Sequence, residues 1–211
     1  MTKKLALNLV CLAVLVGLLF SAVALADDAV GVKEGHWIEY RVITTGDVPE
    51  GHDVAWTRME VVDVEGQNVS FKITLTYSDN VVQTKNETVN LETDNIMEGF
   101  IIPANLDAGE DFESNEGNLT VNDVKEETYA GANRNIVFAN TSQTQFSWDR
   151  STGVLVEANA SYPTFAIVTK VERTNMWQAQ IFGIDPFVFS VPIIAMVIAV
   201  LAFFMIRKVK N

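Results

Sequence analysis

Apolar and polar residues alternate through much of the middle of this chain. Between Val69 and Tyr77 every second residue is apolar, and the residues between them are Ser, Lys or Thr. A period of two is the pattern of a β-strand that buries one face. The same alternation, less regular, recurs in residues 38–42, 56–64 and 165–171. We therefore predict a strand in each of these segments.

Two short polar segments predict hairpin turns. Glu65-Gly66-Gln67 separates two of the predicted strands, and Asp149–Gly153 separates residues 146–148 from residues 154–157, which we also predict to be strands. Glycine and short polar residues are favoured in such turns because they tolerate the backbone angles of a reversal. We expect Gly153 to have a positive φ, which carries no Cβ penalty for glycine.

The remaining pattern is weaker but of the same kind. It predicts further strands at Val81–Leu91, Ile96–Ile102 and Asn135–Ala139, and one helical turn at Ala104–Phe112, which begins after Pro103. No other segment between the two ends has a helical apolar stripe. The fold class is therefore all-β, an antiparallel meander of hairpins. A curved sheet and a two-sheet β-sandwich both fit this pattern.

Both ends of the chain indicate export and a membrane anchor. Residues 1–26 begin with lysines, continue as an apolar run and end in Ala24-Leu25-Ala26, the pattern of a cleaved signal peptide. Residues 182–206 are long and apolar enough to cross a bilayer as a helix, and the basic tail 207–211 is expected in the cytoplasm. Residues 27–181 then form one extracellular β domain on a single-pass anchor. An uncleaved signal anchor, or removal of the tail by a sorting enzyme, are the alternatives.

The charge of the outer segment excludes one class of partner. All 27 acidic residues of the chain lie between Asp27 and Asp185, while five of the 15 basic residues lie in the two ends, which leaves a net charge near −17 for residues 27–185. Nucleic-acid binding is excluded because it depends on Lys and Arg contacts to phosphates. The single cysteine, Cys11, lies within the predicted signal peptide, so the outer segment has no disulfide framework.

Candidate catalytic and metal sites are few. The only histidines, His36 and His52, lie near no nucleophile motif, and two imidazoles without a thiol make a zinc site a poor expectation. The acidic stretch 107–118 is rich in oxygen ligands for Ca²⁺ but lacks the spacing of an EF-hand loop, so we interpret it as a solvated loop. We predict no enzyme activity, no cofactor and no metal.

Three segments resemble a group of archaeal surface proteins: Gly31–Tyr40, Ile101–Glu110 and Trp148–Leu155. Those proteins share a signal peptide, one β-rich outer domain and a C-terminal membrane helix, and most have no assigned activity. The resemblance implies an archaeal cell-envelope setting and transfers no active-site residue. The Asp-x-x-Thr-Gly hairpin with its flanking strands also resembles the curved sheet of lipoprotein carriers of the LolA type, a likeness of fold only.

The outer segment contains five N-glycosylation sequons, none with proline in the middle position. Because we predict export, we expect glycans on several of these asparagines, which are Asn68, Asn86, Asn118, Asn140 and Asn159. Asn68, beside a hairpin turn, and Asn118, in a polar loop, are the most accessible of them in the predicted fold.

The tryptophans are the last candidates for a binding face. Trp37, Trp56 and Trp148 lie in or beside predicted strands, where Trp is ordinarily a core residue, and Trp177 fits the aromatic belt beside a membrane helix.

Together these features predict a membrane-anchored, N-glycosylated cell-surface domain that binds or supports other envelope components or an extracellular ligand. The alternative is a carrier or sensor that holds an apolar ligand in a curved β-sheet. A carrier needs an apolar cavity of several hundred Å³, whereas a structural or adhesive domain should be filled by its own side chains.

Overall fold

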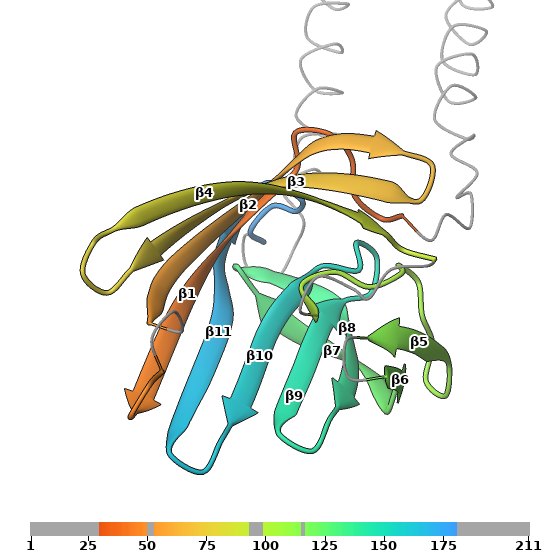
Figure 1. The fold of residues 1–211 in the computed structure, drawn as a ribbon. Helices are drawn as coiled ribbons and strands as arrows, with labels where there is room; N and C mark the ends of the chain where they lie inside the picture. The colour runs from red at the N-terminus through yellow and green to blue at the C-terminus, as the bar shows by residue number, and fades with distance from the viewer. Residues whose placement is uncertain (1–29, 50–52, 93–98, 115–116, 181–211) are drawn as a thin grey trace, which may run out of the picture.

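The computed structural model describes residues 30–49, 53–92, 99–114 and 117–180. They form one antiparallel sheet of nine strands in the order β4-β3-β2-β1-β11-β10-β9-β8-β7 and a separate two-stranded hairpin, β5-β6. Figure 1 shows that the sheet is strongly curved, with a hollow side and an outer side. The strands are β1 (Trp37–Gly46), β2 (Val54–Glu65), β3 (Asn68–Tyr77), β4 (Val82–Asn90), β5 (Asp111–Ser114), β6 (Gly117–Thr120), β7 (Asp123–Tyr129), β8 (Ala132–Asn140), β9 (Thr144–Asp149), β10 (Leu155–Ser161) and β11 (Phe165–Thr174).

The sheet consists of two meanders that meet at its centre. Strands β1–β4 pair in sequence order, and so do β7–β11. The two halves are joined where the first strand pairs with the last, from Ile38 opposite Thr174 to Gly46 opposite Phe165. The prediction of an all-β antiparallel meander is confirmed, and within the described residues it is one curved sheet and not a two-sheet sandwich.

The alternation in the sequence sets the two faces of each strand. In β3 the apolar side chains of Val69, Phe71 and Ile73 are buried on the hollow side, while Lys72 points to solvent on the outer side. Gly66 has a φ of +59° at the first position of the two-residue β2–β3 turn, the position where a type II′ hairpin places glycine. The strands that we predicted from strong alternation are confirmed in β1, β2, β3 and β11, and the weaker ones in β4 and β8.

Two predictions for residues 96–112 are wrong. The described part of Ile96–Ile102 contains no strand, only an isolated bridge between Ile101 and Val154. The helical turn at Ala104–Phe112 is absent because Asn105 and Gly109 have φ values of +65° and +90°, outside the right-handed helical region. Phe112 instead belongs to β5.

The segment after β11 lies against the outer side of the sheet. Trp177 is 9% exposed, its Nε1 donates to the Tyr129 carbonyl at 3.1 Å, and the Arg134 guanidinium lies 5.0 Å from its ring centroid. Gln180 N donates to the carbonyl of Gly131. The expectation that Trp177 belongs to a membrane-facing aromatic belt is therefore wrong, because the protein itself covers the indole.

No helix within the described residues is both long and apolar enough to cross a membrane. The predicted signal peptide 1–26, the predicted span 182–206 and the basic tail 207–211 lie outside the described residues.

Candidate functional site

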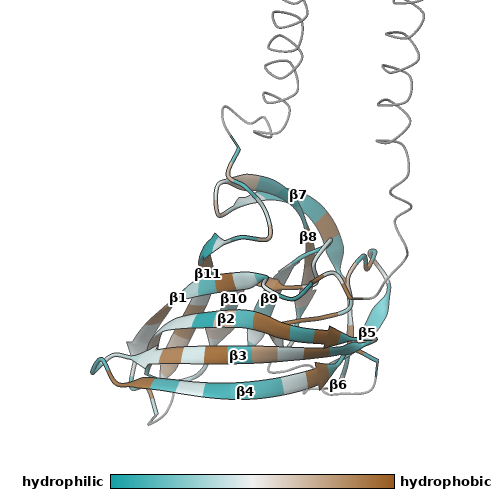
Figure 2. Cartoon of the chain, turned by 90° about the horizontal axis from the view of Figure 1, so that it is seen from above, coloured by the Kyte–Doolittle hydropathy of each residue, from teal (hydrophilic) through white to brown (hydrophobic). Residues whose placement is uncertain are grey.

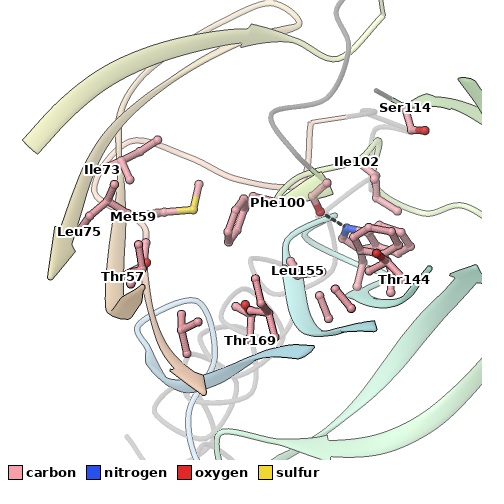
Figure 3. A pocket seen from close by; sticks show the side chains of 18 of the residues that line it. Thr57, Met59, Ile73, Leu75, Phe100, Ile102, Ser114, Thr144, Leu155 and Thr169 are labelled. Atoms are coloured by element: carbon pink, nitrogen blue, oxygen red, sulfur yellow. Dashed lines mark hydrogen bonds between the residues drawn. The ribbon is translucent and has the colours of Figure 1, made fainter. Parts of the chain in front are cut away.

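The hollow side of the sheet encloses a cavity of about 650 Å³. Its walls come from both halves of the sheet, from residues 99–102 and from the β5-β6 hairpin. Figure 3 shows Met59, Ile73 and Leu75 on one side and Leu155 with Thr144 on another, with Phe100 between them. The long apolar side chains of β2 and β3 therefore face a wall across an open space.

Small side chains on the opposite wall leave that space open. Ala158 and Ala160 are successive inward positions of β10, and Thr144 and Thr169 line the cavity from the strands on either side. A folded interior is ordinarily packed with few voids larger than a water molecule. Small residues at these inward positions leave part of the space between the two halves unfilled, although Phe146 and Trp148 of β9 also line it.

Residues 99–102 are fixed across the hollow side by hydrogen bonds to β9 and β10. Leu155 N donates to the Phe100 carbonyl, and Ile102 N donates to the Gly153 carbonyl, both at 2.9 Å. The Trp148 Nε1 donates to the carbonyl of Gly99 at 2.6 Å. These bonds hold the Phe100 ring in the cavity.

Tyr40 supports Phe100 from behind. Its ring meets the Phe100 ring edge-on, with the centroids 5.5 Å apart, and its hydroxyl donates to the Leu155 carbonyl at 2.8 Å. Burial raises the pKa of Tyr40 well above its usual value, so the hydroxyl stays protonated and keeps donating. Tyr40 therefore holds Phe100 in place through contacts that carry no charge.

The predicted β9–β10 turn is built around a buried carboxylate. Asp149 is fully buried and accepts hydrogen bonds from Arg134 Nε at 2.7 Å and from Thr152 N and Oγ1 at 3.0 and 2.8 Å. A paired, fully hydrogen-bonded carboxylate tolerates burial that an isolated one does not. Gly153 has the expected positive φ, +71°. This cluster fixes the β9–β10 turn, to which the segment that carries Phe100 is hydrogen-bonded. None of its residues lines the cavity.

The charged lining of the cavity lies on the edge strand β4. Gln83, Lys85 and Glu87 are its inward side chains, and Tyr77 at the end of β3 donates its hydroxyl to Gln83 Oε1 at 3.0 Å. The Lys85 ammonium lies 2.6 Å from Glu87 Oε1. Sequence reasoning missed this group, because one Lys and one Glu two residues apart are ordinary for an exposed strand.

The structure places four of the five sequons on one face. Asn68 lies opposite Asn90, and Asn86 lies opposite Lys72. Each of these residues is on the outer face, because its neighbours in the strand, Val69 and Lys85 among them, point inward.

The second half of the sheet repeats this placement. Asn140 pairs with Gln145, and Gln145 pairs with Asn159, while Phe146 and Ala158 line the cavity on the opposite face. Asn118 lies in β6, outside the main sheet. Four of the five sequon asparagines are exposed, and Asn159 is half-buried, with its Nδ2 donating to Glu157 at 3.1 Å.

The histidines and the acidic stretch do not come together in the described part of the chain. His36 accepts a hydrogen bond at Nδ1 from Lys33 N, and burial, followed by the charge of Lys33, lowers its pKa. His52 lies outside the described residues. The described part of 107–118 forms a turn and the β5-β6 hairpin, and no three His, Cys, Asp or Glu side chains in the described residues gather as metal ligands would.

The strand tryptophans divide between the two faces of the sheet. Trp148 is buried at 1% exposure and lines the cavity, stacked on Phe146 with the ring centroids 5.1 Å apart. Trp37 and Trp56 are only partly buried, and the Arg58 guanidinium covers Trp37 at 4.3 Å from its centroid. The expectation that all three are core residues therefore holds for Trp148 alone.

Comparison with known proteins adds little to this geometry. No family model matches the chain, and no curated protein matches it. Among solved structures, the chain is similar to one described as "The Siderocalin Ex-FABP functions through dual ligand specificities". The two are 9% identical, with a TM-score of 0.25 over 75% of this chain and 80% of that chain. A TM-score this low assigns neither a family nor a function.

Proposed function

We propose that this protein is a membrane-anchored cell-surface domain that binds an apolar small molecule in the hollow of its curved sheet. The observation that carries the proposal is the cavity of about 650 Å³ between the two halves of the sheet. Its volume falls within the roughly 300–1,000 Å³ typical of small-molecule sites. A domain with a purely structural or adhesive role has no need to leave such a space unfilled.

The lining favours binding over catalysis. The deep walls are mainly apolar with the buried hydroxyls of Thr57, Thr144 and Thr169 among them. The Tyr40 hydroxyl and the Trp148 indole donate to backbone carbonyls, and the buried Asp149 accepts hydrogen bonds from its own turn. Catalysis needs a convergent set of acids, bases or nucleophiles, and the buried lining residues that the structure describes include no acid, base or thiol. The proposal is therefore a carrier or sensor and not an enzyme.

The setting of this domain comes from the sequence. The apolar run 182–206 with its basic tail supports a single-pass anchor, the pattern of residues 1–26 supports export, and the sequons support N-glycosylation. The resemblance to archaeal surface proteins supports a place in the archaeal envelope, and the likeness of fold to LolA-type carriers supports a curved sheet. Nucleic acid is not a partner of a domain with this negative charge.

Photo-crosslinking of the full chain tests the binding proposal. The protein is placed in phosphatidylcholine nanodiscs with diazirine-labelled hexadecanol, and labelled peptides are mapped by mass spectrometry. Labelling of the membrane span is separated from labelling of the outer domain by peptide position. We expect labelled peptides from β2, β3 and β10, whose side chains line the cavity.

A matched pair of variants supplies the control. Ala158 lines the cavity from β10, whereas Ala166 in β11 pairs with Thr45 and Ser161 on the outer face. Ala158→Trp should fill the cavity and lower outer-domain labelling about tenfold, which corresponds to about 1.4 kcal/mol of binding. Ala166→Trp should leave the labelling unchanged. Equal labelling in both variants, or no outer-domain labelling in the unaltered protein, would rule out the cavity as a ligand site.

A further inference from the structure

Between the neighbouring strands β3 and β4 the lining changes from apolar side chains to an amide and charged ones. In the β3–β4 register, Leu75 lies opposite Gln83 and Ile73 lies opposite Lys85. All four of these side chains line the cavity. Figure 2 shows the same division, with brown positions along β3 beside a mostly teal β4. The polarity of the lining therefore changes within the width of one strand pair.

The polar side of this boundary is also where the cavity reaches solvent. Gln83 and Lys85 are the exposed residues among those that line the cavity, and Glu87 is half-buried. β4 is the outermost strand of this half of the sheet and pairs with β3 alone. If a bound molecule is longer than the apolar interior, its protruding end would lie at β4.

The charges at this boundary cancel each other. Lys85 and Glu87 are the only charged side chains among the described residues that line the cavity, and their charged atoms lie 2.6 Å apart. An anionic head group would either face the Glu87 carboxylate or displace that carboxylate from Lys85. A cationic head group would either face the Lys85 ammonium or displace that ammonium from Glu87. A hydroxyl accepts a hydrogen bond from the ammonium and donates one to the carboxylate, so it leaves the ion pair intact.

Building on the proposed function, we propose that the ligand is a single-chain amphiphile with a neutral, hydroxyl-bearing head group. Its chain lies among Ile73, Leu75 and Phe100, and its head group rests on the Lys85–Glu87 pair with Gln83 beside it. We assign one hydrocarbon chain to the ligand because the cavity has the volume of a site for one small molecule. The edge strand thus selects the head group while the interior accepts the chain.

Competition between three compounds with one chain length tests the head-group assignment. Hexadecylglycerol, palmitic acid and hexadecylamine compete with the diazirine-labelled hexadecanol for the full chain in phosphatidylcholine nanodiscs. Outer-domain labelling is divided by labelling of the membrane span, which corrects for the partition of each compound into the bilayer. We expect hexadecylglycerol to compete about tenfold better than either charged compound, a difference of about 1.4 kcal/mol.

Charge variants at the boundary should change this order of preference. Glu87→Gln leaves the Lys85 ammonium without its partner, and palmitic acid should then become the best competitor. Lys85→Gln should favour hexadecylamine instead. Lys72→Gln removes a positive charge from the outer face of β3 and should leave the order unchanged. Lys85 is exposed, so its variant tests the assignment even where Glu87→Gln impairs folding.

The outcomes separate the two proposals. If no labelled compound reaches the outer domain, the proposed function fails, and the head-group assignment fails with it. If the outer domain is labelled but the three competitors are equivalent, or a charged one is best in the unaltered protein, the cavity binds apolar chains and the head-group assignment is wrong. An unchanged order of preference in both Lys85→Gln and Glu87→Gln overturns the assignment as well.

Discussion

At the scale of single residues, Gly153 is the described glycine where an added Cβ would come closest to another atom. Its φ is +71°, and an added Cβ would overlap the carbonyl oxygen of Ile102, whose amide donates to Gly153 itself. We predict that Gly153→Ala lowers the free energy of unfolding by more than about 2 kcal/mol, because backbone strain and a steric overlap add together. Chemical denaturation of the full chain, followed by Trp fluorescence, measures this change.

Gly66 is the matched control for this substitution. It too has a positive φ, +59°, but a Cβ there would meet no atom within 4 Å. Gly66→Ala should therefore lower the free energy of unfolding only through the strain of a positive φ, by about 1 kcal/mol. Equal losses in the two variants would show that the contact with Ile102 contributes nothing to stability.

Sequence reasoning predicted this turn but not what holds it together. Asp, Ser, Thr and Gly in close succession are turn residues for local reasons, so Asp149–Gly153 could be identified without a structure. The bond from Arg134 to Asp149 depends on how β8 and β9 align, which no local pattern reveals. The cavity was unpredictable for a similar reason. The predicted strand 154–157 did not include Ala158, and no local pattern reveals that Ala158 and Leu75 line one unfilled space.

At the scale of elements, sequence reasoning missed β5, β6 and β7, which are short or mostly polar. β7 carries the adjacent charges Lys125, Glu126 and Glu127, and pairs only with β8 among the described strands. An edge strand has less apolar surface to bury, so its alternation is weak and charges are favoured on it. β4 was predicted, but only weakly, since its inward positions are mostly polar. Alternation predicts buried strands well and edge strands poorly.

The position of each sequon within its strand predicts whether its asparagine carries a glycan. Asn86 lies on the edge strand β4, and Asn140 ends β8 beside a turn, and both are exposed. Asn159 lies in β10 between two paired strands, half-buried, with its Nδ2 bonded to Glu157. Because glycan transfer needs exposed chain, we predict glycans at Asn86 and Asn140 and none at Asn159.

Glycopeptide mass spectrometry of the protein from its own host checks this prediction. Asn118 in the β5-β6 hairpin is exposed and serves as the internal reference for an accessible site off the main sheet. Occupancy at Asn159 equal to that at Asn86 would contradict the prediction. Glycans on the outer face would leave the cavity side uncovered.

At the scale of the whole molecule, both ends of the described chain lie at one end of the sheet. Gly31 lies against Ser151 and Thr152 of the β9–β10 turn, and Gln180 bonds to Gly131 of the β7–β8 turn. In a meander every second turn lies at the same end of the sheet, so the β7–β8 and β9–β10 turns lie together at one end. The β8–β9 and β10–β11 turns lie at the other end, opposite both described termini. With a span at 182–206, the membrane would adjoin the first end, and the opposite turns would face outward.

Protease added to intact cells tests this orientation. We predict cleavage within residues 27–181 and survival of a short fragment that ends at Asn211, because the bilayer shields only the span and the tail. A C-terminal epitope tag reports the fragment, and permeabilised cells are the control for access to the tag. A full-length chain that survives on intact cells but is cut after permeabilisation would reverse the topology.

The pairing of β1 with β11 also determines the order in which the domain can fold. A chain exported from its N-terminus presents β1–β4 first, and each of those pairings joins neighbours in sequence. The free side of β1 must then wait for β11, the last strand of the sheet, because Ile38 pairs with Thr174. Contacts between residues this far apart form slowly, and an unpaired central strand is a template for pairing with another chain. If the chain is exported from its N-terminus, the unpaired side of β1 would be open to pairing with another copy of the protein until β11 emerges.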